Sequence, residues 1–237
     1  MNIQLKHLVA AGALTVLAAC SPSTPKDSVK ASEPAAAPAP PTPAKVDLPA
    51  GAYILDKAHG SLSFKLSHLG FSNYTARFAD FDAKLQFDPA NPSAMKVEAT
   101  VDPRSLTLPH PPAGFFKELT GPQWLDAGKF PAITFHSTSV ELTGPKTAKV
   151  TGDFTLHGVT KPVVLDVIFN GGYAGHQMDP HARIGFSATG KLKRGDFGVA
   201  FGIPAPGTTM GVGDEVDVAI EAEFSGPPFV APAKPAA

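Results

Sequence analysis

Apolar and polar residues alternate along most of the chain between residues 51 and 225. The runs 81–87 and 95–101 place phenylalanine, leucine, valine, methionine or alanine at every second position, with charged or polar residues between them. The runs 150–156, 163–169, 184–188 and 216–224 largely repeat this pattern. Strict alternation buries one face of a strand and leaves the other in water, which is typical of antiparallel sheets. The pattern therefore predicts an all-β domain of half-buried strands.

Turn sequences rich in glycine, proline, asparagine and aspartate separate these runs, at residues 88–92, 143–145, 170–172 and 211–214. With further runs near 62–69 and 132–142, the chain contains about eight expected strands. Gly121-Pro122 interrupts the one amphipathic segment, so we expect only one or two short helices. An all-β chain with one apolar face closes into a barrel or stacks two sheets. Periodicity alone leaves both arrangements open.

The first twenty residues have the order of charge and hydropathy of an export signal. Lys6 and His7 precede an uncharged apolar run that is too short to span a bilayer and ends in Leu17-Ala18-Ala19-Cys20. This end resembles the lipobox of bacterial lipoproteins, in which Cys20 is acylated; the alternative is a plain signal peptide with an incidental cysteine. We expect residues 1–20 to be a lipoprotein signal peptide, and Cys20 to anchor the chain to a membrane. Ser21 follows the cysteine where an aspartate would be the alternative, which resembles the pattern of lipoproteins sorted to the outer membrane of Gram-negative bacteria. We therefore expect the protein in the cell envelope, on the periplasmic face of the outer membrane.

Composition sets the expected limits of the folded part. Residues 21–50 are dominated by proline and alanine, which predicts an extended linker, and residues 226–237 repeat that composition as a tail expected to be disordered. Residues 51–225 remain as one domain. Cys20 is the only cysteine, so an intramolecular disulfide is excluded, and the formal net charge of −1 gives no reason to expect nucleic-acid binding.

Two other classes of function were weighed on the residues. The segment Gly175–His181 brings His176, Met178, Asp179 and His181 together, a combination that can bind copper and that also occurs in ordinary loops. A hydrolase needs a nucleophile paired with a base, yet the chain has no G-x-S-x-G or H-E-x-x-H motif and no free cysteine beyond position 20. We therefore assign no catalytic residue, no metal site and no cofactor, and expect the chain not to be an enzyme.

Several segments together resemble the YceI-like polyisoprenoid-binding family. They are YILDKAHGSLSF…LQFDP (53–89), KFPAITFHSTSVE (129–141), VTGDFTLHGVTKPVVLDVIFNG (150–171), KLKRGDFGV (191–199) and VGDEVDVAIEAEF (212–224). The resemblance implies an eight-stranded antiparallel, lipocalin-like barrel whose cavity takes a polyisoprenoid or fatty chain, and relatives suggest a homodimer. The proline-rich stretch 106–131, which includes part of the expected mouth of the cavity, departs from the family because it lacks the family's Arg-Asp pair.

The pattern alone leaves open whether the apolar strand faces pack a solid core or line a cavity. The resemblance favours a cavity, and we expect His68 to be a polar point at one end of it. The mouth is expected at residues 109–124 and 202–207. The residues expected to line the lipid-binding cavity are Leu62, Phe64, Leu66, His68, Phe81, Leu85, Phe87, Val97, Ile133, Phe135, Phe154, Leu156, Phe169 and Phe186.

Overall fold

The computed structural model describes residues 41–230. The predicted signal peptide with Cys20, the first part of the predicted linker (21–40) and the end of the tail (231–237) lie outside the described residues. The strands are β1 Gly51–Leu55, β2 Ser61–His68, β3 Ser72–Phe78, β4 Phe81–Phe87, β5 Lys96–Val101, β6 Leu106–Thr107, β7 Ile133–Gly144, β8 Thr147–Leu156, β9 Val159–Tyr173, β10 His181–Lys193 and β11 Val212–Pro228.

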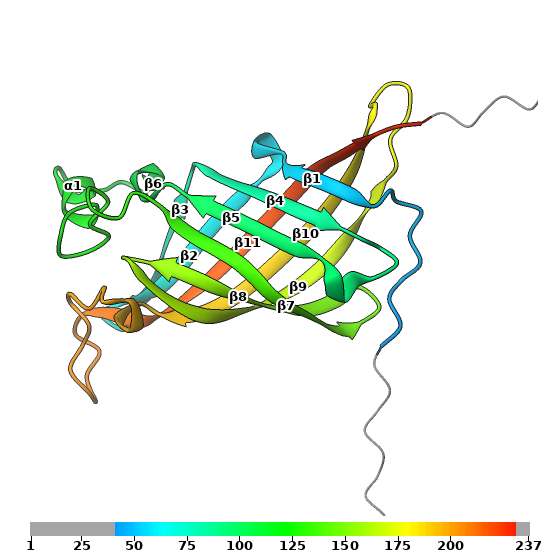
Figure 1. The fold of residues 1–237 in the computed structure, drawn as a ribbon. Coiled ribbons are helices and arrows are strands. Elements are labelled where there is room, and N and C mark those ends of the chain that lie inside the picture. Colours follow the sequence, from blue (N-terminus) through cyan, green and yellow to red (C-terminus); the bar gives the residue numbers. More distant parts are fainter. Residues whose placement is uncertain (1–40, 231–237) are drawn as a thin grey trace, which may run out of the picture. The chain divides into compact units, whose positions relative to one another are not determined.

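These eleven strands form one antiparallel sheet that closes on itself (Figure 1). The hydrogen-bonded circuit runs β1-β4-β5-β7-β8-β9-β10-β11 and returns to β1, which makes an eight-stranded barrel. The other three strands, β2, β3 and β6, extend positions of this circuit and add no new ones. β2 continues the position of β1, because both strands pair with β11. β3 pairs with β2 on one side and with β6 on the other. The expected barrel of eight antiparallel strands is confirmed, and closure gives each strand of the circuit a neighbour on both sides.

Helical structure is limited to short segments among residues 41–230. The single α-helix, α1 (Phe115–Leu119), lies in the stretch between β6 and β7. Four 3-10 turns are η1 Lys57–His59, η2 Pro92–Ala94, η3 Pro103–Ser105 and η4 Arg194–Phe197. No helix in this part of the chain is long and apolar enough to cross a membrane.

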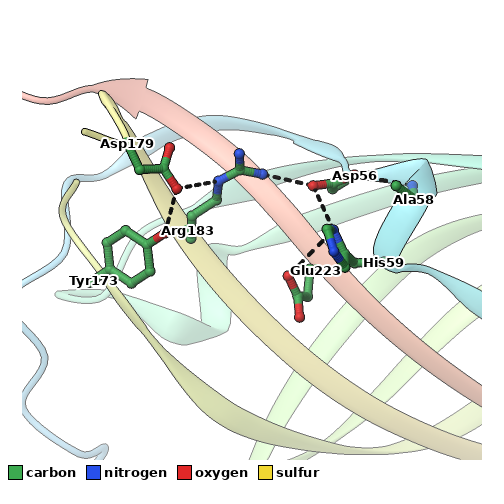
Figure 2. Close-up of polar contacts among 7 residues, drawn as sticks. All are labelled: Asp56, Ala58, His59, Tyr173, Asp179, Arg183 and Glu223. Carbon is green, nitrogen blue, oxygen red and sulfur yellow. Dashed lines mark hydrogen bonds and ion pairs between the residues drawn. The ribbon is translucent and has the colours of Figure 1, made fainter. Parts of the chain in front are cut away.

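A polar network holds the break between β1 and β2 (Figure 2). Asp56 caps η1 by accepting a hydrogen bond from the Ala58 amide at 3.1 Å. The same carboxylate accepts hydrogen bonds from His59 Nδ1 at 3.0 Å and from Arg183 Nη1 of β10 at 2.8 Å. The bond from His59 chiefly lowers the pKa of Asp56, and the Asp56 carboxylate raises the pKa of His59. His59 therefore has a structural position on the outer wall of the barrel.

Arg183 extends this network to the loop between β9 and β10. Its Nε donates to Asp179 at 3.3 Å, and the same carboxylate accepts a hydrogen bond from the Tyr173 hydroxyl (Figure 2). The bond from Tyr173 chiefly lowers the pKa of Asp179. One guanidinium thus joins the β1–β2 break to the β9–β10 loop across β11, whose Glu223 lies 4.0 Å from His59.

The packed part of the chain extends past both expected domain limits. Before residue 51, the Ala44 amide donates to the Pro145 carbonyl at 2.8 Å, Leu48 is buried in the core, and Pro49 accepts a hydrogen bond from the Tyr53 hydroxyl. After residue 225, β11 continues to Pro228. Residues 44–49 and 226–228 therefore pack with the domain that the sequence predicted at 51–225.

Candidate binding cavity

The inner face of the barrel divides into a packed level and a hollow level. Inward-pointing residues of several strands remain only half-buried although they lie inside the barrel, as Phe169, Phe186 and Ala188 show. A solid core would bury these side chains almost completely, because protein interiors are close-packed. Instead they face a cavity of about 280 Å³, close to the lower bound of the ~300–1,000 Å³ typical of small-molecule pockets.

Most of the residues expected to line the cavity do so. The lining combines large aromatic side chains with small ones such as Ala99 and Gly190. Gly152 on β8 leaves room for the ring of Phe135 on the neighbouring strand β7, because a Cβ at this position would come within 2.3 Å of that ring. The expected residues found in the lining are Leu62, Phe81, Leu85, Phe87, Val97, Ile133, Phe135, Phe154, Phe169 and Phe186.

Phe64, Leu66, His68 and Leu156 do not line this cavity, so their assignment to it is wrong. Phe64 stacks on Phe78 at a centroid distance of 5.4 Å, and Leu156 is buried in the cluster that fills one end of the barrel. His68 is exposed at the end of β2. A strand advances by about 6.6 Å for every two residues. Residues 64, 66 and 68 therefore point to successive levels beyond the cavity, although they share the face of Leu62.

The closed end of the barrel is filled by side chains from loops as well as strands. Phe197 and Val199, from η4 and the residues after it, pack with Ile133, Leu156 and Val163 in one buried cluster. Trp124, from the segment between α1 and β7, packs against this cluster. Figure 1 shows α1 and the loop that precedes β11 at this end. We use "closed end" for the residues of this cluster.

Arg194 fixes the loop that covers the closed end. Its guanidinium, with the residue only 4% exposed, donates to the carbonyl oxygens of Val199, Phe201, Val212 and Gly213 at 2.7 to 2.9 Å. Burial lowers the pKa of the Arg194 guanidinium, although the negative charge of Asp214 acts in the opposite direction and raises it. These four bonds tie both ends of the loop 199–213 to one buried cation, since carbonyl acceptors satisfy most of its donors.

The other end of the cavity is reached by exposed residues. Three segments contribute to the lining, namely Pro43, Ala44 and Val46 before β1, Pro89, Pro92 and Met95 between β4 and β5, and Pro145 to Thr147 where β7 turns into β8. Lys96, Pro145 and Lys146 are exposed as well as lining. We call these segments the open end; Figure 1 shows it opposite α1. Residues 109–124 and 202–207 contribute nothing to the lining, so the expectation of a mouth there is wrong.

Two polar side chains of the lining make internal hydrogen bonds. Ser137 Oγ accepts from the Val97 amide at 2.9 Å, and Lys96 Nζ donates to the Thr138 carbonyl at 3.0 Å. Among residues 41–230, no histidine, aspartate or glutamate lines the cavity.

The segment Gly175–His181 does not gather its possible metal ligands. His176 Nδ1 accepts a hydrogen bond from the Met178 amide, and the Asp179 carboxylate is engaged by Tyr173 and Arg183. The Met178 side chain is 89% exposed. Within residues 41–230, no group of three or more His, Cys, Asp or Glu side chains is placed to hold a metal ion.

The fold and cavity have counterparts among known proteins. A family model described as the YceI-like domain matches residues 53–224, which is most of the described chain. The chain belongs to the YceI-like family. The family match spans all eight positions of the barrel and nearly all of the cavity lining, apart from residues 43–46 at the open end.

Individual YceI-like relatives extend this match. The "UPF0312 protein" of Pseudomonas syringae pv. syringae is 41% identical over 173 residues, which cover 71% of this chain and 84% of the relative. The crystal structure of Burkholderia cenocepacia BcnA is similar with a TM-score of 0.61 and 25% identity, over 71% of this chain and 98% of that one. A polyisoprenoid-binding domain from Saccharophagus degradans shares the fold with a TM-score of 0.55 and 13% identity, over 76% and 100% of the two chains.

Sequence reasoning missed the contribution of residues 43–46 to the cavity. Their proline- and alanine-rich surroundings hide two isolated apolar residues, Val46 and Leu48, of which Val46 lines the cavity and Leu48 is buried in the adjoining core. Two apolar positions two residues apart, just before the first strand, are the one signal that could have indicated packing there.

Proposed function

We propose that this protein binds one long-chain amphiphile, a polyisoprenoid or a fatty chain, inside the barrel and carries or sequesters it. The supporting observation is the cavity itself, whose inward phenylalanines are half-buried and whose walls are almost entirely apolar. Membership of the YceI-like family and the fold shared with a polyisoprenoid-binding domain support the same ligand class.

The energetics of an apolar chain fit such a site. Ten methylene groups moved from water into the cavity contribute ~8 kcal/mol, at ~0.8 kcal/mol each. Association costs of ~4 kcal/mol or more reduce this gain. Binding therefore needs a chain long enough to fill the cavity and does not depend on many polar contacts. A narrow cavity of about 280 Å³ favours a slender chain over a bulky ring system.

A function in binding rather than catalysis is part of this proposal. It is supported by the lack of titratable histidine and carboxylate groups among the lining residues within 41–230. The same proposal places the protein in the cell envelope, held by acylated Cys20 on the periplasmic face of the outer membrane. Cys20→Ala should move the chain from the membrane fraction to the soluble fraction of lysed cells; retention in the membrane would contradict the anchor. A homodimer in solution is tested by light scattering of the same variant.

Solvent extraction of the Cys20→Ala chain tests the ligand class. This variant can be purified without detergent and carries no acyl chain of its own. Mass spectrometry of the organic extract should find an isoprenoid or fatty species near one per protein. An empty protein that also fails to take up an added sixteen-carbon chain would refute the proposal. Stoichiometric copper in the same sample would instead favour the loop at residues 175–181.

A further inference from the structure

The cavity ends on a level of apolar side chains next to the closed end. On three strands the lining stops at one residue, and the inward residue two positions further toward the closed end does not line the cavity. The lining residues at this level are Leu62 of β2, Phe154 of β8 and Val218 of β11; the residues beyond them are Phe64, Leu156 and Val216. Leu156 and Val216 are buried. We call Leu62, Phe154 and Val218 the floor of the cavity.

Phe154 is the largest side chain of the floor and separates the cavity from the closed end. Its ring meets the ring of Phe197 edge-on, at a centroid distance of 5.3 Å and an interplanar angle of 86°. Phe197 is 2% exposed and does not line the cavity. Phe154 lies inside the barrel and is only half-buried, as expected of a side chain that borders a hollow. One ring therefore contacts both the packed closed end and the space that a ligand would fill.

The surroundings of the floor offer almost no polar side chain. Of the six residues opposite the floor in the strand register, five are apolar or glycine, namely Phe64, Phe78, Phe135, Gly190 and Ile220. The sixth is Lys161 of β9, opposite Phe154. Lys161 is exposed, lies 3.7 Å from Asp196 and does not line the cavity. A polar group of a ligand would therefore be buried at the floor without a side-chain partner, which is costly.

The strand register gives the depth of the cavity above the floor. On β8 the lining runs from Thr147, at the open end, to Phe154. These seven steps of ~3.3 Å make ~23 Å along the strand. Strands of an eight-stranded barrel tilt by ~40° from its axis, which leaves a depth of ~18 Å. An extended carbon chain advances ~1.2 Å per bond, so about fifteen carbons fit between the floor and the open end.

We propose that the ligand enters with its apolar end first, and that Phe154 sets the longest chain that the cavity holds, at about fifteen carbons. This inference rests on the proposed function. The apolar floor accepts a methyl end and excludes a headgroup, which stays in water at the open end. Carbons beyond the limit remain among exposed residues at the open end and add little to binding, because they stay in contact with water.

The single tryptophan of the chain reports which end of a ligand reaches the floor. Trp124 packs against the closed-end cluster, and bromine quenches tryptophan fluorescence only at short range. The probes are 16-bromohexadecanoate and 2-bromohexadecanoate, each added to saturation to the full chain carrying Cys20→Ala. The 16-bromo probe should quench Trp124 about threefold more strongly. Equal quenching, or stronger quenching by the 2-bromo probe, would overturn the orientation of the ligand.

Alkyl maltosides with chains of eight to eighteen carbons measure the length limit, because their disaccharide stays in water. Titration calorimetry below their micelle concentrations should show an affinity that rises about fourfold per methylene. The rise should end near fifteen carbons. Phe154→Ala should move this limit up by about three carbons, because loss of the ring deepens the cavity. Phe154→Leu removes fewer atoms and should move it by about one carbon, which keeps the test open if the alanine variant does not fold.

Phe169→Ala is the matched control. Phe169 is also a half-buried phenylalanine of the lining, but it lies at the open end, where its amide donates to the Lys146 carbonyl at 2.8 Å. This variant should weaken all maltosides by a similar factor and leave the limit in place. An unchanged limit in the folded Phe154 variants would overturn the role of Phe154 and leave the proposed function standing. If no maltoside and no brominated chain binds to the folded parent chain, the proposed function and this inference both fail.

Discussion

Filling the cavity from one wall should stabilise the fold and weaken ligand binding. Ala188 of β10 lines the cavity and is half-buried, and its cross-strand neighbours Val167 and Ile220 line it too. Ala188→Leu adds three carbons, worth ~2.4 kcal/mol at ~0.8 kcal/mol per buried methylene. Fixing the leucine side chain costs ~0.5–1 kcal/mol. We expect the free energy of unfolding to rise by about 1–2 kcal/mol.

The same three carbons occupy space that the ligand would fill. Displacing up to three ligand methylenes weakens binding by as much as ~2.4 kcal/mol, which corresponds to about fiftyfold in Kd. Urea denaturation measures the stability, and the binding of a neutral pyrene-labelled alkane, followed by its fluorescence, measures the affinity. Ala52→Leu is the control, because Ala52 is exposed on the outer face of β1 and should change neither quantity.

The opposite result would show a solid core. Adding three carbons to a well-packed interior forces strained side chains and costs ~1–3 kcal/mol. A clear loss of stability in Ala188→Leu, with unchanged affinity for the alkane, would therefore refute a hollow level at residues 167, 188 and 220.

Three further predictions concern the ends and the outer wall. Arg194→Gln should lower the free energy of unfolding by about 3 kcal/mol, because it leaves buried carbonyl groups without their charged donor. Chemical denaturation measures this change, and a loss below about 1 kcal/mol would contradict the reasoning. The pKa of His59 is raised in the folded state. Its contribution to stability is therefore present below pH ~6.5 and is lost as the pH rises through the folded-state pKa. The pKa of Asp56 is lowered in the folded state, so its contribution is present above pH ~3.9 and is lost as the pH falls through the folded-state pKa. Thermal unfolding from pH 5.5 to 8.5 should show a smaller decline in His59→Gln than in the parent chain, and identical slopes would contradict this reasoning. Ala44→Pro removes the amide that donates a hydrogen bond to the Pro145 carbonyl, a bond worth ~1 kcal/mol. The rate at which the labelled alkane leaves the cavity, measured by stopped-flow fluorescence, should therefore rise about fivefold. An unchanged rate would show that residues 43–46 do not restrict exit of the ligand.

The sequence by itself determined which face of each strand points inward. Buried and exposed residues alternate through the whole of β4, and in the runs that end at Phe169 and Phe224 the inward residues are buried or half-buried while most of those between them are exposed. It also indicated the eight positions of the barrel, because turn residues mark the ends of the runs; the shorter strands β1, β3 and β6 were not predicted. Alternation predicts the inward face because successive side chains of a strand point to opposite faces, whatever the strand packs against.

Tertiary structure alone decided which level of the interior is hollow. Leu62 and Phe64 are equivalent in the alternating pattern of β2, yet only Leu62 reaches the cavity, because loop residues such as Phe197 fill the closed end. Arg194 looks like part of a basic surface stretch, and becomes buried only because four carbonyls of distant residues surround it. The period of the sequence pattern shows which face of the sheet a side chain points to. The level that the side chain occupies along the barrel axis depends on contacts between segments that are far apart in the sequence.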